Sequence, residues 1–367
     1  MNTLTTEVSM RRTLLALLPA LAVACAACGG PASAGADAGV TAASGGQPPA
    51  AQPIGAPATP TPSAADAGSG AAATSASAWQ PCAASIAAGQ GIRAVSGSGA
   101  SDLWAVGPAG MALHRTSDGW TAYCKAGGPA LAAVWSAAAN DAWMVGGATV
   151  LHWDGAAVSE VSAPAPAQPF TAVWGLGPAD LWALSSAEVL HFDGRGWTRS
   201  TAADMRTLGF DFGAFRDVWG AGPGEVTIAA ERGALRYDGT GWFASLAAPA
   251  DQLISSTWSA GPGDGWAAGK NLDGGSALWR FSGNAWAQQA FVQRPVLDAV
   301  RGSSRTDLWF LSGSDLLHWD GAAVATVAAP AAPAGAPHVL GPAEIYLPDA
   351  LGIARWDGAA WSRVLAK

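Results

Sequence analysis

The chain has 367 residues, a formal net charge of −8 and only 13% charged residues. Its basic residues do not cluster, which excludes nucleic acid and anionic lipid surfaces as main partners, because both bind through clustered Lys and Arg that release counterions. All 19 Trp residues lie at or after Trp79, so only residues 79–367 can bury a sizeable core.

The N-terminus carries the pattern of an export signal. Arg11 and Arg12 precede an apolar run at residues 13–24 that is too short to span a membrane. The run ends in Leu-Ala-Val-Ala-Cys at 21–25, which resembles the lipobox of bacterial lipoproteins. This resemblance implies a signal peptide at 1–24 and a lipidated Cys25, with Cys28 as the alternative. Cleavage at Ala-x-Ala without lipidation and a start at Met10 remain open. We expect a monomer in the bacterial envelope, at the outer membrane or the cell surface.

Residues 25–78 consist almost entirely of Ala, Gly, Pro, Ser and Thr, and they predict a disordered tether. In an oxidising compartment Cys82 and Cys124 are expected to form a disulfide. Two isolated Cys lack the spacing of a metal site, and no metal or cofactor is predicted. A second possibility is that residues 79–85 add a strand to the last repeat and help to close the fold.

Seven copies of one unit follow. Clear copies begin with Leu-Ala-Ala-Val-Trp-Ser at 131–136, Phe-Thr-Ala-Val-Trp-Gly at 170–175, Phe-Arg-Asp-Val-Trp-Gly at 215–220 and Ile-Ser-Ser-Thr-Trp-Ser at 254–259. Weaker copies begin at residues 92, 297 and 336, and successive starts are 39, 39, 45, 39, 43 and 39 residues apart. Each unit shows an apolar strand, a Gly/Pro turn, a strand such as Leu-Trp-Ala-Leu at 181–184, a strand ending in an aromatic residue and Asp-Gly, and a fourth strand that often carries Trp. Four short strands per roughly 40 residues are the period of a β-propeller blade.

The hairpin at residues 140–155 favours a propeller over a half-exposed sheet. Both faces of its strands carry Trp and aliphatic residues, as stacked blades require. With the turn centred on Gly146 and Gly147, Asp141 is expected to lie opposite His152. We therefore predict an all-β, seven-bladed propeller of four-stranded blades at residues 79–367.

The layout Val-Trp-Gly, Asp-Leu-Trp, Leu-His-Trp-Asp-Gly and Trp is similar to tectonin-type β-propeller repeats. Ser-Asp-Gly-Trp at 117–120 also resembles the Asp-box of sialidase-like propellers. The whole pattern looks like the Trp-Asp-Gly repeat lipoproteins of myxobacteria. The resemblance covers residues 92–367 and implies the fold; tectonin-like propellers bind glycans, but related repeats have many functions.

An acid and a base recur in every unit, and four of the five His residues occupy the basic position. We interpret them as cross-strand pairs that stabilise the fold, because metal ligands or a catalytic dyad would converge at one place and Arg replaces His in three units. The pairs are Asp102 with His114, Asp141 with His152, Asp180 with His191, Glu225 with Arg236, Asp264 with Arg280, Asp307 with His318, and Glu344 with Arg355.

Two insertions interrupt the repeat, at residues 201–214 and 270–276. In a four-stranded blade both are expected on the same face, because loops between blades share a face with the loops between second and third strands. They combine aromatic platforms with polar groups suited to a glycan or another polar ligand, unless they are neutral insertions. The candidate ligand-binding residues are Arg206, Phe210, Asp211, Phe212, Lys270, Asn271 and Asp273.

These features predict a lipid-anchored binding module for a glycan or protein ligand. The alternatives are a secreted hydrolase of sialidase or lyase type and a purely structural envelope protein. The sequence contains no known catalytic motif that would identify a nucleophile, so we do not expect an enzyme. Arg, Tyr and Glu converging on the central channel would favour the hydrolase, whereas Trp and turn residues there would favour binding.

Overall fold

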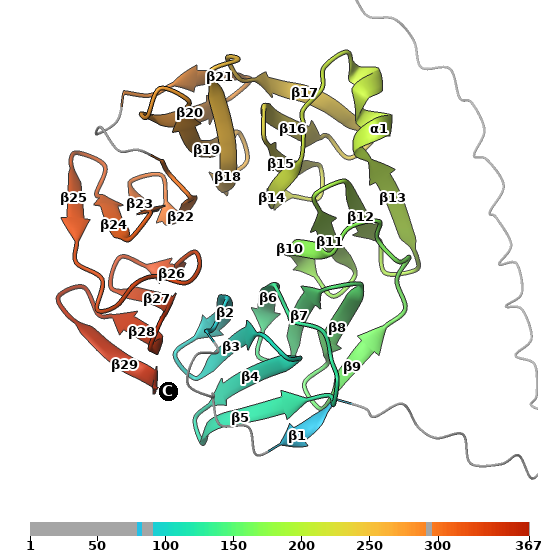
Figure 1. Cartoon of the computed structure of the whole chain (residues 1–367), viewed down its shortest axis with the longest axis vertical. Coiled ribbons are helices and arrows are strands. Elements are labelled where there is room, and N and C mark those ends of the chain that lie inside the picture. The colour runs from blue at the N-terminus through green and yellow to red at the C-terminus, as the bar shows by residue number, and fades with distance from the viewer. Residues whose placement is uncertain (1–78, 83–90, 291–295, 367) are drawn as a thin grey trace, which may run out of the picture. The chain divides into compact units, whose positions relative to one another are not determined.

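The computed structural model describes residues 79–82, 91–290 and 296–366. They form seven antiparallel sheets arranged as the blades of a ring (Figure 1). Successive strands of a blade are neighbours in its sheet, from the innermost to the outermost. This confirms the predicted seven-bladed propeller. No helix in the described part of the chain has the length and apolarity needed to cross a membrane.

The blades have the following strands, in chain order. Blade one contains β2 (Ala94–Gly99), β3 (Asp102–Gly107), β4 (Met111–Thr116) and β5 (Gly119–Cys124); blade two contains β6 (Ala133–Ala138), β7 (Asp141–Gly146), β8 (Thr149–Trp153) and β9 (Val158–Val161). Blade three contains β10 (Phe170–Gly177), β11 (Asp180–Ser185), β12 (Glu188–Phe192) and β13 (Trp197–Thr201); blade four contains β14 (Phe215–Gly222), β15 (Glu225–Ala230), β16 (Gly233–Tyr237) and β17 (Trp242–Ala247). Blade five contains β18 (Gln252–Gly261), β19 (Asp264–Asn271), β20 (Ser276–Ser282) and β21 (Ala285–Gln288); blade six contains β22 (Ala299–Ser304), β23 (Asp307–Ser312), β24 (Asp315–Trp319) and β25 (Val324–Val327). Blade seven contains β26 (His338–Gly341), β27 (Glu344–Asp349), β28 (Gly352–Trp356) and β29 (Trp361–Ala366). Helix α1 (Ala202–Met205) and the 3-10 turn η1 (Arg206–Leu208) lie between blades three and four.

Turns with the sequence aromatic-Asp-Gly join the third and fourth strands of five blades. In blade two, Asp154 Oδ1 accepts hydrogen bonds from the backbone N–H groups of Ala157 and Ala156, both at 2.9 Å, and these bonds lower the pKa of the carboxyl group. Gly155 has a φ of 92°, and a Cβ there would lie 2.8 Å from the Cβ of Asn140 in the neighbouring turn. The motif is therefore turn chemistry rather than a ligand site.

Indole rings pack the inner strands of neighbouring blades together. A Cβ on Gly220 of blade four would lie 2.4 Å from the ring of Trp174 of blade three. Trp135 packs in the same way against Gly175, and Trp258 against Gly302. The repeated Gly has no side chain and therefore leaves room for the indole of the repeated Trp on the neighbouring blade.

The ring closes through side chains, because blades one and seven each supply all four of their own strands. Trp120 Nε1 of blade one donates to the Val364 carbonyl of blade seven at 2.8 Å. Its counterpart Trp286 donates to Ser245 of the preceding blade, also at 2.8 Å. The seam between the last and first blades thus repeats a contact that is used within the ring.

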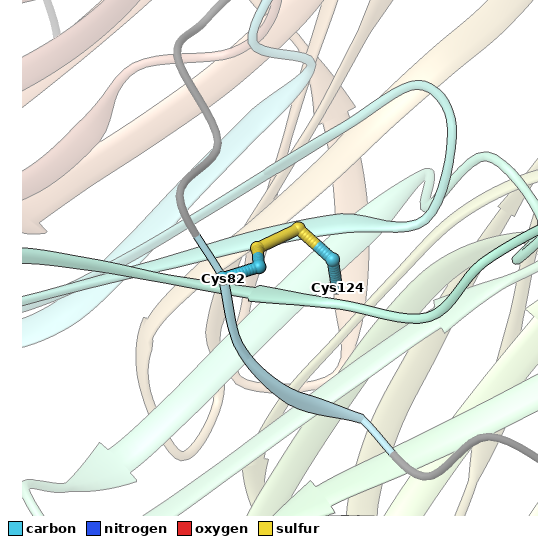
Figure 2. The surroundings of a disulfide bond; sticks show 2 residues. All are labelled: Cys82 and Cys124. Atoms are coloured by element: carbon cyan, nitrogen blue, oxygen red, sulfur yellow. A yellow bond between two sulfur atoms is a disulfide. The ribbon is translucent and has the colours of Figure 1, made fainter.

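The predicted disulfide between Cys82 and Cys124 is confirmed (Figure 2). Strand β1 (Gln80–Cys82) pairs with β5 and extends blade one to five strands. Trp79, at the start of this segment, is 5% exposed and packs with Trp104 and Trp153 between blades one and two. Residues 79–82 therefore strengthen the first blade, and the alternative that they join the last blade is wrong.

The predicted register of the hairpin at residues 140–155 is wrong by two residues, although its faces are correct. Trp143, not Asp141, lies opposite His152, because Gly146 pairs with Thr149 and the turn is shifted towards the C-terminus. Only Gly147 has a positive φ, of 57°. Gly146 is required for another reason: a Cβ there would lie 2.2 Å from the Ala130 carbonyl oxygen. The two adjacent glycines therefore do not mark the centre of the turn.

Candidate functional site

A cavity of about 600 Å³ lies at the centre of the ring, and its lining includes residues of the innermost strands or strand entries of all seven blades. These strands, β2, β6, β10, β14, β18, β22 and β26, face the middle of the view in Figure 1. Because the blades have similar frameworks, differences around the cavity come from the side chains at equivalent positions of the repeat.

The strongest departures from the repeat line this cavity. The third position of the six-residue repeat start is Ala in blades one, two, three and six, but it is Asp217, Ser256 and His338 in the other blades. The fifth position, which is Trp in four blades, is Arg301 in blade six. These residues were not among the sequence-predicted site residues. Comparing the seven repeat starts position by position would have found them, because they replace small or aromatic residues by charged or polar ones.

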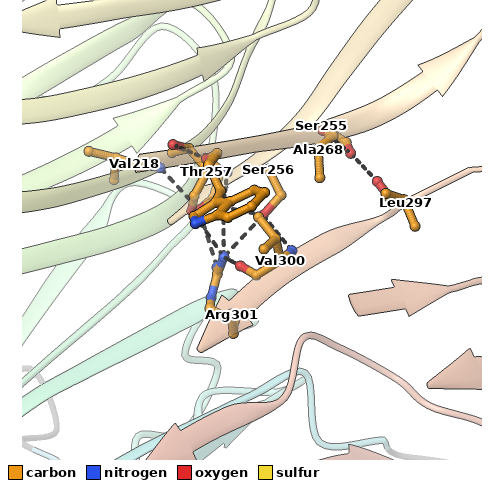
Figure 3. A network of polar contacts seen from close by, with 10 residues as sticks. Val218, Ser255, Ser256, Thr257, Ala268, Leu297, Val300 and Arg301 are labelled. Atoms are coloured by element: carbon orange, nitrogen blue, oxygen red, sulfur yellow. Dashed lines mark hydrogen bonds and ion pairs between the residues drawn. The ribbon is translucent and has the colours of Figure 1, made fainter. Parts of the chain in front are cut away.

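Arg301 and Asp217 join blades four and six across blade five. Arg301 Nη1 lies 3.0 Å from Asp217 Oδ2, and Nη2 lies 3.3 Å from Oδ1. Nη1 also lies 3.0 Å from Ser256 Oγ, and the whole arrangement crosses the inner strand of blade five (Figure 3). A forked guanidinium–carboxylate contact of this kind fixes orientation as well as distance.

The Asp217 carboxylate is fully used by its neighbours. Besides Arg301, its oxygens accept hydrogen bonds from the backbone N–H groups of Val218 at 3.0 Å and Thr257 at 3.1 Å, and from the hydroxyl of Ser256 at 2.8 Å. The guanidinium carbon of Arg301 lies 5.1 Å from the centre of the Trp219 ring. This network therefore holds three blades in position, and the charges of Arg301 and Asp217 neutralise each other.

His338 joins the last blade to the first. Its Nε2 lies 3.1 Å from the Gly97 amide nitrogen and 2.8 Å from the Gly97 carbonyl oxygen. Burial lowers the pKa of His338, and the positive charge of Arg301 lowers it further; the Gly97 backbone contact and the carboxylates of Glu344 and Asp102 oppose this change. The neutral imidazole is thus the favoured form at this seam.

This pKa direction predicts that acid weakens the seam. Because the folded-state pKa lies below the ordinary value of 6.5, the stabilisation is complete above pH 6.5 and is lost as the pH falls from 6.5 towards the folded-state pKa. The free energy of unfolding should fall by up to about 1.4 kcal/mol per pH unit in this range. Urea unfolding of the wild type and His338→Gln between pH 5 and 7.5 measures the difference. A constant difference across this range would contradict the prediction.

The cavity has two unlike walls. Blades two and three provide a wall that has no charged residue and is mostly apolar, here called the apolar wall. It includes the half-buried indole of Trp135, and its residues are Ala132, Ala133, Val134, Trp135, Ser136, Thr171, Ala172 and Val173. The wall from blade four round to blade one carries every charged residue that lines the cavity, with Ser256, His338 and apolar residues such as Trp219 and Trp258 among them; the charged residues are Arg216, Asp217, Asp298, Arg301 and Arg93. Neither Tyr nor Glu occurs among the described residues that line the cavity. An occupant with one apolar and one polar side would match these walls.

The acid and the base of each repeat are in contact in every blade. The distances are 3.0 Å for His114–Asp102, 2.9 Å for His152–Asp141 and His191–Asp180, 2.6 Å for Arg236–Glu225, 3.2 Å for Arg280–Asp264, 2.7 Å for His318–Asp307 and 4.0 Å for Arg355–Glu344. The four His rings also stack on the Trp residue directly across the strand pair, at centroid distances of 3.8–4.2 Å. Such repeated packing belongs to the blade framework rather than to one reactive centre.

Replacing Asp141 tests this structural role. Its Oδ1 accepts hydrogen bonds from Trp143 Nε1 at 3.0 Å and from His152 Nε2 at 2.9 Å, so Asp141→Ala leaves two donors without their acceptor. We expect a loss of about 2 kcal/mol in the free energy of unfolding, measured by urea denaturation, with ligand binding retained. The exposed Asp118→Ala is the control. Loss of binding or activity without destabilisation would show that the pair has a functional role.

The sequence-predicted loop residues form two separate groups. Arg206 Nε lies 3.6 Å from Asp211, which also contacts Arg232 of the β15–β16 turn at 3.4 Å. Asn271 and Asp273 hydrogen-bond within their own turn, to Ser276 and Gly275, and Lys270 is exposed. Among the described residues no hydrogen bond or ion pair joins the first group to the second.

Phe212 corrects the expectation of two aromatic platforms. It is 3% exposed and packs in the core with Met205 and Phe215, and the half-buried Phe210 meets it edge to face at 4.7 Å. The spacing of two aromatic residues in an insertion cannot reveal that one of them anchors the loop. Exposed apolar groups on this face are instead Leu208, Leu272 and Leu351, at 36%, 59% and 53% exposure.

Known sequences give no match, either among protein-family models or among curated proteins. Solved structures match the fold. YCF48 from Cyanidioschyzon merolae is 15% identical, with a TM-score of 0.56 over 76% of this chain and 98% of its own; a structure of YCF48 bound to D1 peptide is 16% identical, with a TM-score of 0.57 over 76% and 96%. The extracellular domain of the putative one-component system BT4673 from B. thetaiotaomicron is 12% identical, with a TM-score of 0.58 over 78% of this chain and 40% of that chain. The WD40 β-propeller domain of Doa1 is 10% identical, with a TM-score of 0.58 over 78% and 96%. At these identities the likeness establishes a WD40-like propeller fold.

Proposed function

We propose that the protein is an exported, lipid-anchored interaction module that binds a segment of another envelope protein in its central cavity. The observation that carries this proposal is the pair of unlike walls around the 600 Å³ cavity. A peptide segment offers apolar side chains and polar backbone groups together, and it can enter a cavity of this volume.

Two features favour a protein ligand over a glycan. The burial of Phe212 removes one of the ring faces on which a sugar would stack, whereas the exposed tips on the same side are leucines. Apolar tips beside charged groups are typical of protein interfaces. YCF48, which shares the fold, has been solved bound to D1 peptide, so a propeller of this type can hold a peptide.

We propose a binding role without catalysis. Two of the three arginines that line the cavity are engaged by carboxylates of the protein: Arg301 by Asp217, and Arg216 by Glu231. A hydrolase of sialidase type would need free arginines together with a Tyr nucleophile and its Glu partner.

The proposed anchor depends on Cys25, which lies outside the described residues. Cys25→Ser should move the protein from the detergent phase to the aqueous phase in Triton X-114 partitioning of cells that export it, because the acyl chains are lost. Cys28→Ser is the matched control and should remain in the detergent phase. If only Cys28→Ser moved to the aqueous phase, Cys28 would be the anchor. If the wild type itself were found in the aqueous phase, the protein would have no lipid anchor.

Binding of the labelled full chain to arrays of 15-residue peptides from envelope proteins, alongside a glycan array, tests the ligand class. We expect reproducible peptide binding that soluble peptide competes away, and no glycan signal. Binding to glycans but not to peptides would show that the ligand is a carbohydrate and not a protein. No signal on either array would contradict the proposed function.

A further inference from the structure

One charged side chain of the central cavity, Arg93, has no partner in the part of the chain that the structure describes. Arg93 belongs to blade one, is exposed, and makes no hydrogen bond or ion pair through its guanidinium with any residue that the structure describes. Arg301 is held by Asp217 and Arg216 by Glu231, so their positive charges are neutralised locally. In a chain with a net charge of −8, Arg93 is therefore a positive charge that faces a cavity and is not compensated by any residue within 79–82, 91–290 or 296–366.

The backbone fixes the place of Arg93. Its N–H donates to the Val106 carbonyl at 2.8 Å, which ties the residue to the β2–β3 pair. On its other side, a Cβ on Gly335, just before the first strand of blade seven, would lie 2.1 Å from the Arg93 carbonyl oxygen. The two backbone segments are therefore in close contact. The backbone of Arg93 is thus held on both sides, as a binding group requires.

Arg93 stands where the two walls of the cavity meet. Blade two, whose Ala132 occupies the equivalent repeat position, begins the apolar wall. Blades one and two are in direct contact there, since the Ser136 amide donates to Ser96 Oγ at 3.1 Å. The only carboxylate at the equivalent position of another blade is Asp298, two blades away on the other side. An anionic group is therefore attracted to blade one and repelled from blade six.

We infer that the ligand presents a carboxylate to Arg93 and an apolar side chain to the wall formed by blades two and three. This inference rests on the proposed function and specifies its ligand chemistry. A guanidinium binds a carboxylate through two parallel hydrogen bonds, and the apolar wall adds contact area beside it. The carboxylate can belong to an acidic side chain or to the free C-terminus of a partner.

Three acetylated tetrapeptides with the full chain test the inference: Ala-Ala-Ala-Leu with a free C-terminus, the same peptide amidated, and amidated Ala-Ala-Asp-Leu. Isothermal titration calorimetry measures their affinities. We expect at least one carboxylate peptide to bind at least tenfold more tightly than the neutral amide. The one that does so identifies the source of the carboxylate. Replacing Leu by Ser should weaken that peptide, because the apolar wall loses its partner.

Arg93→Gln should remove the carboxylate preference while leaving the neutral peptide unchanged. Arg195→Gln is the matched control, since Arg195 is also exposed and without a guanidinium partner among the described residues but lies outside the cavity. An unchanged melting temperature shows that Arg93→Gln is folded. Equal affinities for acid and amide peptides, or an unaltered preference in Arg93→Gln, would overturn the inference and leave the proposed function standing. Absence of binding to any peptide, here and on the arrays, would overturn both.

Discussion

Removing the Cys82–Cys124 disulfide is expected to lower the free energy of unfolding by about 4 kcal/mol, the value for closing a loop of this length in the unfolded chain. The bond joins residues 42 positions apart. The segment that it holds is short: β1 pairs with β5 over only three residues, one of which is Pro81. Backbone pairing alone therefore contributes little, and the bond and the buried Trp79 hold the segment in place.

Urea denaturation of the full chain with Cys82→Ala and Cys124→Ala, compared with the oxidised wild type, measures this effect. The reduced wild type is the control and should match the double variant. Trp79→Ala, with the disulfide intact, should lower the free energy of unfolding by about 3 kcal/mol, because the buried indole is lost. A change below about 1 kcal/mol in the cysteine variant would show that blade one does not depend on this link.

Asp217→Ala should cost about 3 kcal/mol, because it leaves the half-buried guanidinium of Arg301 without a counter-charge. Asp217 is 8% exposed and also accepts hydrogen bonds from Ser256 and the Thr257 amide. The carboxylate links blades four, five and six, so its loss should destabilise the ring cooperatively. Urea denaturation gives the magnitude.

A double-mutant cycle with Arg301→Met separates the pair from its surroundings. The coupling energy should be at least about 1.5 kcal/mol, and the double variant should be more stable than Asp217→Ala, since no buried charge is left unpaired. Asp217→Asn, which keeps an acceptor for Thr257, is the milder control. Additive effects of the two substitutions would contradict a direct link between the blades.

The sequence predicts the architecture well because the repeat records contacts that every blade must make. The Asp-Gly turn, the acid–base pair and the inner Trp each satisfy a local requirement, so their spacing shows the blade count. The hairpin register was less predictable, because Gly146 and Gly147 look alike in sequence but serve different purposes. One avoids a clash with Ala130 and the other adopts a positive φ.

The candidate site was predictable only in part. The insertions are visible as extra length, but extra length does not show that the fold buries Phe212. The cavity residues add no length; they change side-chain chemistry within the repeat. Arg301 occupies a position at which four other blades have Trp, and it reaches two blades away to Asp217. The partner of such a residue depends on which blades the curvature of the ring brings together, and the sequence of a single repeat does not show this.

The proposed role of the central cavity is tested most directly by blocking it. Thr171 is exposed and lines the apolar wall, and Thr198 is exposed on β13 outside the cavity; each hydroxyl makes only a long contact to a backbone carbonyl, at 3.4 and 3.5 Å. Thr171→Trp should reduce peptide affinity at least tenfold, while Thr198→Trp should bind as the wild type does. Equal affinity of both variants, with unchanged melting temperatures, would contradict a ligand in the central cavity.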